Sequence, residues 1–293
     1  MNRRARRNNA IAFGAIRALA LAFLLLVIFV LLYIVVEGHS ELFRGAFYTS
    51  PPSTDHAGSG AGPQIFNTFY LLVLTLILTV PTGLASGIYF AEYAGTGPVI
   101  NAIRRATETL ATLPSIVVGL FGYALFVQAT GSHPSRLAAG LALTVIALPY
   151  AVRITEDALR SLPPTLRESS LALGATRWQT ITRVLLPAAL PQLVTGVILI
   201  AGRCFGEAAA VLFTGTVGTP TDHANYSLSP FLPGDTLAVN LFVFRSQVEP
   251  GTVPDAAQYS DGLAALLILL VLVFNIGARF MARRTVRRLQ GAV

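Results

Sequence analysis

Two charged residues stand at the end of a long apolar stretch of this sequence. Residues 184–202 carry no side chain charged at pH 7 and are long enough to cross a membrane, and Arg203 and Glu207 follow soon after. An ionised group inside a membrane costs at least about 2.5–3.5 kcal/mol, so such groups normally face a cavity or a partner. A guanidinium stays charged at any working pH, and its N–H donors match the oxygens of an anion such as phosphate. Arg203 is therefore a candidate anion contact.

Glu207 lies four residues after Arg203, a spacing at which two side chains on one helix can meet. In the functional interpretation, Glu207 holds Arg203 while the path is empty. In the structural interpretation, the two residues form a salt bridge that locks one helix to another. Arg153, near the inner end of another apolar stretch, also has two explanations: its side chain snorkels to the membrane surface, or it is a second anion contact at the exit.

The composition excludes several other kinds of chemistry. Of 293 residues, 54% are hydrophobic and 12% are charged, compared with about 25% charged residues in soluble domains. All 21 basic residues are arginines, so the chain lacks the lysine of a phosphate-binding loop and cannot hydrolyse ATP by that route alone. The single cysteine, Cys204, excludes an internal disulfide. No metal site is expected, because ligand spacing is missing from the four histidines, His39, His56, His133 and His223.

Charge-free stretches predict six transmembrane helices and an all-α fold, since about 20 apolar residues cross the hydrocarbon core of a membrane. The fourth stretch is the least certain by hydropathy. The first is expected to be an uncleaved anchor, because its apolar part is too long for a signal peptide and no small-residue cleavage site follows it cleanly. The six stretches are 18–36, 65–91, 109–135, 137–152, 184–202 and 262–278.

The arginines predict the orientation, because the cytoplasmic flanks of membrane helices are enriched in basic residues. With the N-terminus inside, most of the 21 arginines fall on the cytoplasmic side, whereas Arg44, Arg136 and Arg245 fall outside. More than half of the acidic residues fall in the outer loops. Both distributions predict that the N- and C-termini are cytoplasmic. The net charge of +7 follows from this topology, so nucleic-acid binding is not needed to explain it.

The segments between the predicted spans differ in length. Two outer segments are rich in Gly, Pro, Asp and Asn, which favours loops over a second folded domain. A short cytoplasmic connection is expected at 92–108. The resulting division is a basic N-terminus at 1–17, a transmembrane domain at 18–282 with outer loops 37–63 and 215–261, and a basic tail at 283–293.

The cytoplasmic segment 156–183 is longer than a turn between two spans requires. Apolar residues recur at helical spacing before Gly174 and again after it, starting at Trp178. Glycine at this point allows a positive φ, as at a helix C-cap or a tight turn. We expect a short helix, a turn and another short helix, with apolar side chains outside the bilayer. Such a surface predicts a partner protein.

This segment resembles the cytoplasmic signature of the inner-membrane permease subunits of bacterial ATP-binding-cassette (ABC) importers. The signature is Glu-Ala-Ala, three residues, Gly, nine residues, Ile, any residue, Leu-Pro. Here Glu168-Ser169-Ser170, Gly174 and Val184-Leu185-Leu186-Pro187 reproduce every spacing, with two Ser for Ala and Val for Ile. The resemblance implies a type I, MetI-like permease with six spans. It also implies that this segment docks into a groove of an ATPase subunit through Glu168, Gly174, Ala175, Trp178 and Pro187.

A narrower resemblance is to the permease subunits of the phosphate importer. Residues 114–122, 202–209 and 87–94 look like segments of those subunits, with Ala208 in place of Thr. The short N-terminal region and residues 235–261 are more similar to the PstA type than to the PstC type. The implied partners are a PstC-like permease, two PstB-like ATPases and an extracytoplasmic PstS-like phosphate-binding protein. No cofactor is implied in this chain, since ATP and Mg would bind the ATPases.

The resemblance therefore implies a phosphate permease subunit in a bacterial inner membrane, one that does no covalent chemistry itself. Two alternatives remain open. A permease for another oxyanion or small solute would keep the segment from Glu168 to Pro187 but would not need Arg203. An ATP-independent channel or secondary carrier would need no ATPase partner.

Overall fold

The structure is a computed structural model that describes residues 3–53, 58–95, 97–218, 222, 224–249 and 251–290. Both predicted outer loops, 37–63 and 215–261, contain positions outside these ranges, and so does the end of the tail, 283–293. His56 and His223 also lie outside the described residues. Every regular element within the described ranges is helical, which confirms the all-α prediction.

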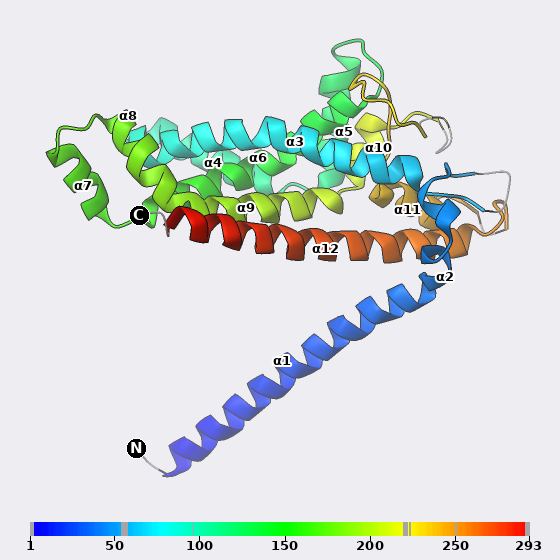
Figure 1. The fold of residues 1–293 in the computed structure, drawn as a ribbon, viewed down its shortest axis with the longest axis horizontal. Helices are drawn as coiled ribbons and strands as arrows, with labels where there is room; N and C mark the ends of the chain where they lie inside the picture. The colour runs from blue at the N-terminus through cyan, green and yellow to red at the C-terminus, as the bar shows by residue number, and fades with distance from the viewer. Residues whose placement is uncertain are drawn as a thin grey trace.

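Four long helices lie side by side in the bundle (Figure 1). Each of these helices contains all or most of one of the apolar stretches, so the sequence located these four spans. Within the described ranges, five helices are long and apolar enough to cross a membrane, and one bent pair forms a sixth candidate. The four bundle helices are α3 (Gly62–Ile88), α6 (Arg136–Arg160), α9 (Leu186–Phe205) and α12 (Ala256–Gln290).

Helix α6, which holds the stretch least certain by hydropathy, is the most buried of the spans. It packs most extensively on α3, where small residues bring the two backbones close together. A Cβ at Gly83 would overlap Ala151, and one at Gly87 would overlap Thr155. A helix enclosed by protein needs small residues more than large apolar ones, and this explains its weak hydropathy signal.

The third predicted span, 109–135, is interrupted by a break near its start. Helix α4 (Pro98–Thr112) and the pair α5 (Ser115–Tyr123) and η3 (Ala124–Gln128) meet at an angle of 104°. Leu113 is extended at the break, as expected for a residue before a proline, and Pro114 has no N–H to continue the helix. The connection expected at 92–108 is thus largely helical, since α4 occupies most of it.

Helix α1 (Arg3–Glu37) contains the first predicted span and departs from the bundle (Figure 1). It contacts α12 and α2 (His39–Leu42), and its apolar stretch is not buried inside the chain. Figure 1 places the N- and C-terminal ends at the same end of the molecule's long axis as α7 (Pro164–Ala172) and α8 (Arg177–Thr180).

The opposite end of the bundle carries short helices that the turn-rich composition did not predict. These are α2, η1 (Gly45–Tyr48) and α11 (Leu237–Ser246). Helix α10 (Ala209–Gly215), which precedes the second turn-rich segment, lies at the same end (Figure 1). Apolar side chains of the two predicted outer segments pack together with the start of α12 in one core. This core contains Phe47, Ala61, Leu237, Phe244, Tyr259, Leu263 and Leu266.

Arg136 was expected in an outer loop but is the first residue of α6 and is fully buried. Its guanidinium donates to the carbonyls of Asn225, Ser227 and Ser229, and it lies 5.4 Å from the ring centroid of Tyr70. The residue therefore orders the chain before α11. Buried charges require such partners, and Arg136 obtains them from backbone oxygens.

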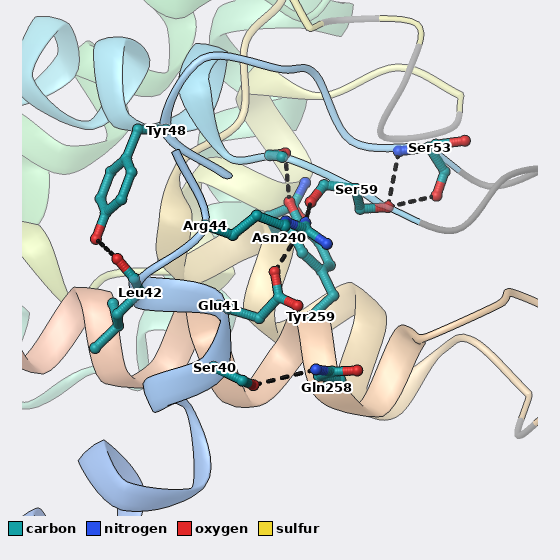
Figure 2. A network of polar contacts seen from close by, with 11 residues as sticks. Ser40, Glu41, Leu42, Arg44, Tyr48, Ser53, Ser59, Asn240, Gln258 and Tyr259 are labelled. Atoms are coloured by element: carbon teal, nitrogen blue, oxygen red, sulfur yellow. Dashed lines mark hydrogen bonds and ion pairs between the residues drawn. The ribbon is translucent and has the colours of Figure 1, made fainter. Parts of the chain in front are cut away.

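Glu41 in α2 is another buried charge at this end, with 4% of its surface exposed. Figure 2 shows it beside Arg44, whose Nη2 lies 2.8 Å from Glu41 Oε2 and also donates to the Ser59 carbonyl. Burial raises the pKa of Glu41 above its ordinary value, Arg44 lowers it in part, and Asp255 adds to the rise. The folded protein thus favours the protonated carboxyl more than the unfolded chain does.

Glu41→Gln is expected to stabilise the protein at pH 7. A raised folded pKa means that stability falls as pH rises from the ordinary value of 4.5 toward the folded value, because the folded state binds more protons there. Glutamine carries no charge, so the variant avoids the loss of stability that comes from ionising the buried carboxyl. The measurement is the melting temperature in detergent between pH 4 and pH 8. Glu37→Gln, at an exposed position, is the matched control, and an equal rise in both variants would contradict the prediction.

Candidate functional site

The segment between α6 and α9 forms the predicted helix, turn and helix. Helix α7 ends at Ala172, Gly174 has a φ of +82°, and α8 starts at Arg177, so the positive φ expected at Gly174 is confirmed. Thr176 and Gln179 cap α8 reciprocally through side chain and backbone. A π-helical turn, η4 (Ile181–Leu185), then joins α8 to α9. Figure 1 shows α7 and α8 at the extreme end of the bundle.

Residues 164–180, the α7–α8 turn, present apolar side chains to the outside. Leu173 is 89% exposed and Trp178 is 60% exposed. Inside the turn, the Ser170 and Thr180 hydroxyls form a buried hydrogen bond of 2.9 Å that holds α7 against α8. An exposed apolar protrusion of this kind is suited to docking on another protein.

The predicted docking residues differ in their exposure and in their position relative to the α7–α8 turn. Glu168, Gly174 and Trp178 are exposed on the α7–α8 turn, and Ala175 is half-buried between the two helices. Pro187 lies outside the turn, as the second residue of α9.

Gly174→Ala is expected to loosen the α7–α8 turn. Among the described residues, no atom lies within 4 Å of a Cβ at this position, so the cost comes from the positive φ and not from crowding. That cost is about 1–2 kcal/mol, which corresponds to about tenfold faster amide hydrogen exchange in residues 164–180. Gly174→Asn is the matched control, because asparagine adopts positive φ more readily. Equal exchange in the two variants would contradict this explanation.

An ion pair connects the α7–α8 turn to the bundle. Arg167 in α7 donates through Nε and Nη2 to Glu92 Oε1, at 2.9 and 2.7 Å. Glu92 lies in the π-helical turn η2 (Tyr89–Tyr93), which continues α3. Both side chains are mostly buried, so the pair is shielded from solvent.

A second ionic cluster joins the middle of α4 to the C-terminal end of α6. Glu156 of α6 pairs with Arg104 of α4 and, at 3.0 Å, with Arg160. The Phe90 carbonyl accepts hydrogen bonds from the same two arginines at 3.2 Å. No contact among these residues was predicted from the sequence. A usable signal was present, since charges flanking separate spans must pair when those spans pack together.

Arg203 lies in the last turn of α9, and its side chain is exposed. Its Nη1 donates to Tyr150 Oη of α6 at 3.0 Å, and its Cζ lies 4.6 Å from the centroid of the Tyr150 ring. The expected contact between Arg203 and Glu207 is absent from the ion pairs of the described chain. The reason is local. Helix α9 ends at Phe205, so Glu207 is not on the helix and does not lie one helical turn from Arg203.

A cavity of about 540 Å³ lies between α4 and α6 and contains Arg153, Arg104, Tyr150 and Glu108 in its wall. Arg153 Nε is 3.7 Å from Asp157 Oδ2, and the Arg153 side chain is 73% exposed. Tyr150 lines this cavity and also contacts Arg203, so it connects the two candidate anion contacts. Tyr150 was not predicted from the sequence as a site residue.

The arrangement offers two exposed guanidinium groups along one pair of helices, and an apolar protrusion at the end of the bundle. Arg153 is one turn farther along α6 than Tyr150, toward the α7–α8 turn. Guanidinium groups can bind an anion but supply no nucleophile or general base at neutral pH.

Comparisons with known proteins give related sequences and related folds. The model of the family described as "Binding-protein-dependent transport system inner membrane component" matches residues 80–291. The Bacillus subtilis (strain 168) protein named "Probable ABC transporter permease protein YqgI" is 44% identical over 265 residues, which are 88% of this chain and 89% of the relative. The phosphate transport system permease protein PstA of Xylella fastidiosa (strain Temecula1 / ATCC 700964) is 33% identical over 236 residues, 80% of this chain and 78% of the relative.

Two solved structures share the fold. A bacterial ABC transporter involved in the import of the acidic polysaccharide alginate has a TM-score of 0.67 at 15% identity and covers 96% of this chain and 98% of its own. The methionine ABC transporter MetNI, in an inward-facing conformation, has a TM-score of 0.55 at 21% identity and covers 78% of this chain and 93% of its own. At these identities the similarity concerns the fold, which is the predicted MetI-like permease architecture.

Proposed function

Because the chain belongs to the family of binding-protein-dependent transport system inner membrane components, we propose that it is the PstA-type permease subunit of an ATP-driven importer of inorganic phosphate. As an ABC importer permease it is a transport subunit and not itself an enzyme. The observation that carries the phosphate assignment is Arg203, an exposed and permanently charged group in a membrane span of a chain similar to PstA permeases. Its partners would be a PstC-like permease, two PstB-like ATPases and a PstS-like binding protein.

Phosphate would meet Arg203 first and Arg153 next. Within the described chain, Arg203 makes a single side-chain hydrogen bond, to a neutral phenol, so most of its five N–H donors remain available for phosphate oxygens. Arg153 is similarly exposed and lies closer to the α7–α8 turn. Two modest contacts suit a transport path, because a site must release its anion as well as bind it.

The α7–α8 turn would transmit the work of ATP hydrolysis, which takes place on the ATPase subunits. Glu168, Gly174, Ala175 and Trp178 would dock it there, with Pro187 directing the chain into α9. The arginine distribution favours a cytoplasmic location for this end, together with both termini, which lie on the same side in Figure 1. The Arg167–Glu92 pair gives the turn a direct connection to α3.

Transport by the complete importer in proteoliposomes tests the proposal. Labelled phosphate is supplied with its binding protein outside and ATP inside, and uptake is expected only when all three are present. Unlabelled sulfate or unlabelled molybdate is added in excess as a competitor. Neither anion is expected to change phosphate uptake. Uptake without ATP would favour a carrier, and preferred uptake of another anion would assign the permease to that anion.

A further inference from the structure

We propose that Tyr150 is a positioning residue that links Arg203 to the bend between α4 and α5. The proposal rests on the proposed function only for the identity of the anion that approaches Arg203. The link itself is a property of three packed helices and can be tested without any anion.

One hydroxyl group joins the three helices. Tyr150 Oη accepts a hydrogen bond from Arg203 Nη1 of α9 at 3.0 Å. The same hydroxyl donates to the carbonyl oxygen of Ala111, in α4, also at 3.0 Å. The phenol thus uses its donor toward α4 and an acceptor position toward α9, while its ring lies against the guanidinium.

The Ala111 carbonyl needs a donor because the helix ends just after it. In a continuous helix, the N–H of Ser115 would fill this role, but the chain turns through 104° between Thr112 and Ser115. Pro114 has no N–H that could substitute in a tighter turn. The carbonyl is therefore one of the groups that a helix C-terminus leaves without an internal partner, and the Tyr150 hydroxyl satisfies it.

The two hydrogen bonds support each other. A charged donor at the phenol oxygen polarises the O–H group and strengthens its donation to Ala111. An anion is a stronger acceptor for a guanidinium than a neutral phenol is, so an arriving anion competes with Tyr150 for Arg203. Capture of Arg203 by the anion would then weaken the support of the bend. Arrival of the anion would thus affect α4. Arg104 of α4 pairs with Glu156 of α6, so the effect would extend to Glu156.

Hydrogen exchange of the purified complete importer, without phosphate, tests the link. Tyr150→Phe keeps the ring beside Arg203 but removes both hydrogen bonds, and Arg203→Ala removes the charged donor. Each variant is expected to speed amide exchange in residues 109–118 about threefold to tenfold, the effect of losing one such bond. The double variant is expected to match Tyr150→Phe alone, because both changes act on one hydroxyl. Tyr123→Phe, half-buried in the adjacent α5, is the control.

Hydrogen exchange in the presence of phosphate provides a second test. Saturating phosphate is expected to speed exchange in residues 109–118 of the wild type, and to have no effect there in the Tyr150→Phe variant. The link is refuted if Tyr150→Phe leaves exchange at the bend unchanged, or if the effects of the two single variants add. If the variants behave as expected but phosphate is inert and is not transported, the link stands and the assignment of phosphate fails.

Discussion

Arg203→Ala is expected to lower phosphate uptake by about a hundredfold while the importer still assembles. Removing a charged hydrogen-bond donor costs up to about 3 kcal/mol, which corresponds to roughly this factor. The loss is severe because, in the membrane, little water replaces the missing charge. Arg203→Lys keeps the charge but loses the planar fork and the stacking on Tyr150, so we expect a loss of about tenfold.

Two controls separate this effect from damage to the fold. Arg245→Ala removes an exposed arginine at the opposite end of the bundle from the α7–α8 turn, where it pairs with Asp261 at 3.5 Å, and is expected to transport normally. Glu207→Gln is expected to have a small effect, because Glu207 does not hold Arg203 in the structure. Copurification with the ATPase measures assembly. Normal uptake by an assembled Arg203→Ala importer would refute the anion contact.

Reversing either charge of the Arg167–Glu92 pair is expected to uncouple ATP hydrolysis from transport. Arg167→Glu places two carboxylates together, and Glu92→Arg places two guanidinium groups together, in a place where solvent screens them weakly. The α7–α8 turn would then lose its contact with the end of α3. We expect each single variant to transport at least tenfold less phosphate per ATP hydrolysed.

The double variant, Arg167→Glu with Glu92→Arg, restores the opposite charges and is expected to recover at least half of the coupling. Uptake and ATP hydrolysis are measured together in proteoliposomes. Arg105→Glu is the control, since Arg105 is exposed on α4 and donates to a carbonyl of its own helix. A double variant as defective as either single variant would mean that these charges act on a partner subunit and not on each other.

The sequence predicted those features of the fold that follow from local physics. Apolar length located the helices, and the rarity of positive φ in other residues made Gly174 a reliable turn. Hydropathy underestimated α6, because it measures suitability for lipid whereas α6 is the span most buried against other helices. The 104° bend was not predicted, although Pro114 lies within it. A proline shows where a helix is weak, and the direction of the bend depends on packing against other helices.

The candidate site was predictable in its charges but not in its contacts. Arg203 was identified because an arginine in a span is costly, and this argument requires no knowledge of its neighbours. Its contact was expected within the same helix, at Glu207, and lies instead across the bundle at Tyr150. Arg167 and Glu92 were overlooked for the same reason, since sequence spacing gives no information about partners that meet only when α3 and α7 pack.

The π-helical turn η4 has a consequence for how relatives of this chain can differ. In η4 the Leu186 N–H donates to the Ile181 carbonyl, five residues earlier, so the turn holds one residue more than an α-helical turn. Deleting that residue would rotate the α7–α8 turn by about 100° around the axis of α9 and draw it about 1.5 Å toward the bundle. Trp178 would then point to another side. A one-residue gap between Thr180 and Leu186 in a sequence alignment would mark a changed docking direction, with the docking surface itself intact.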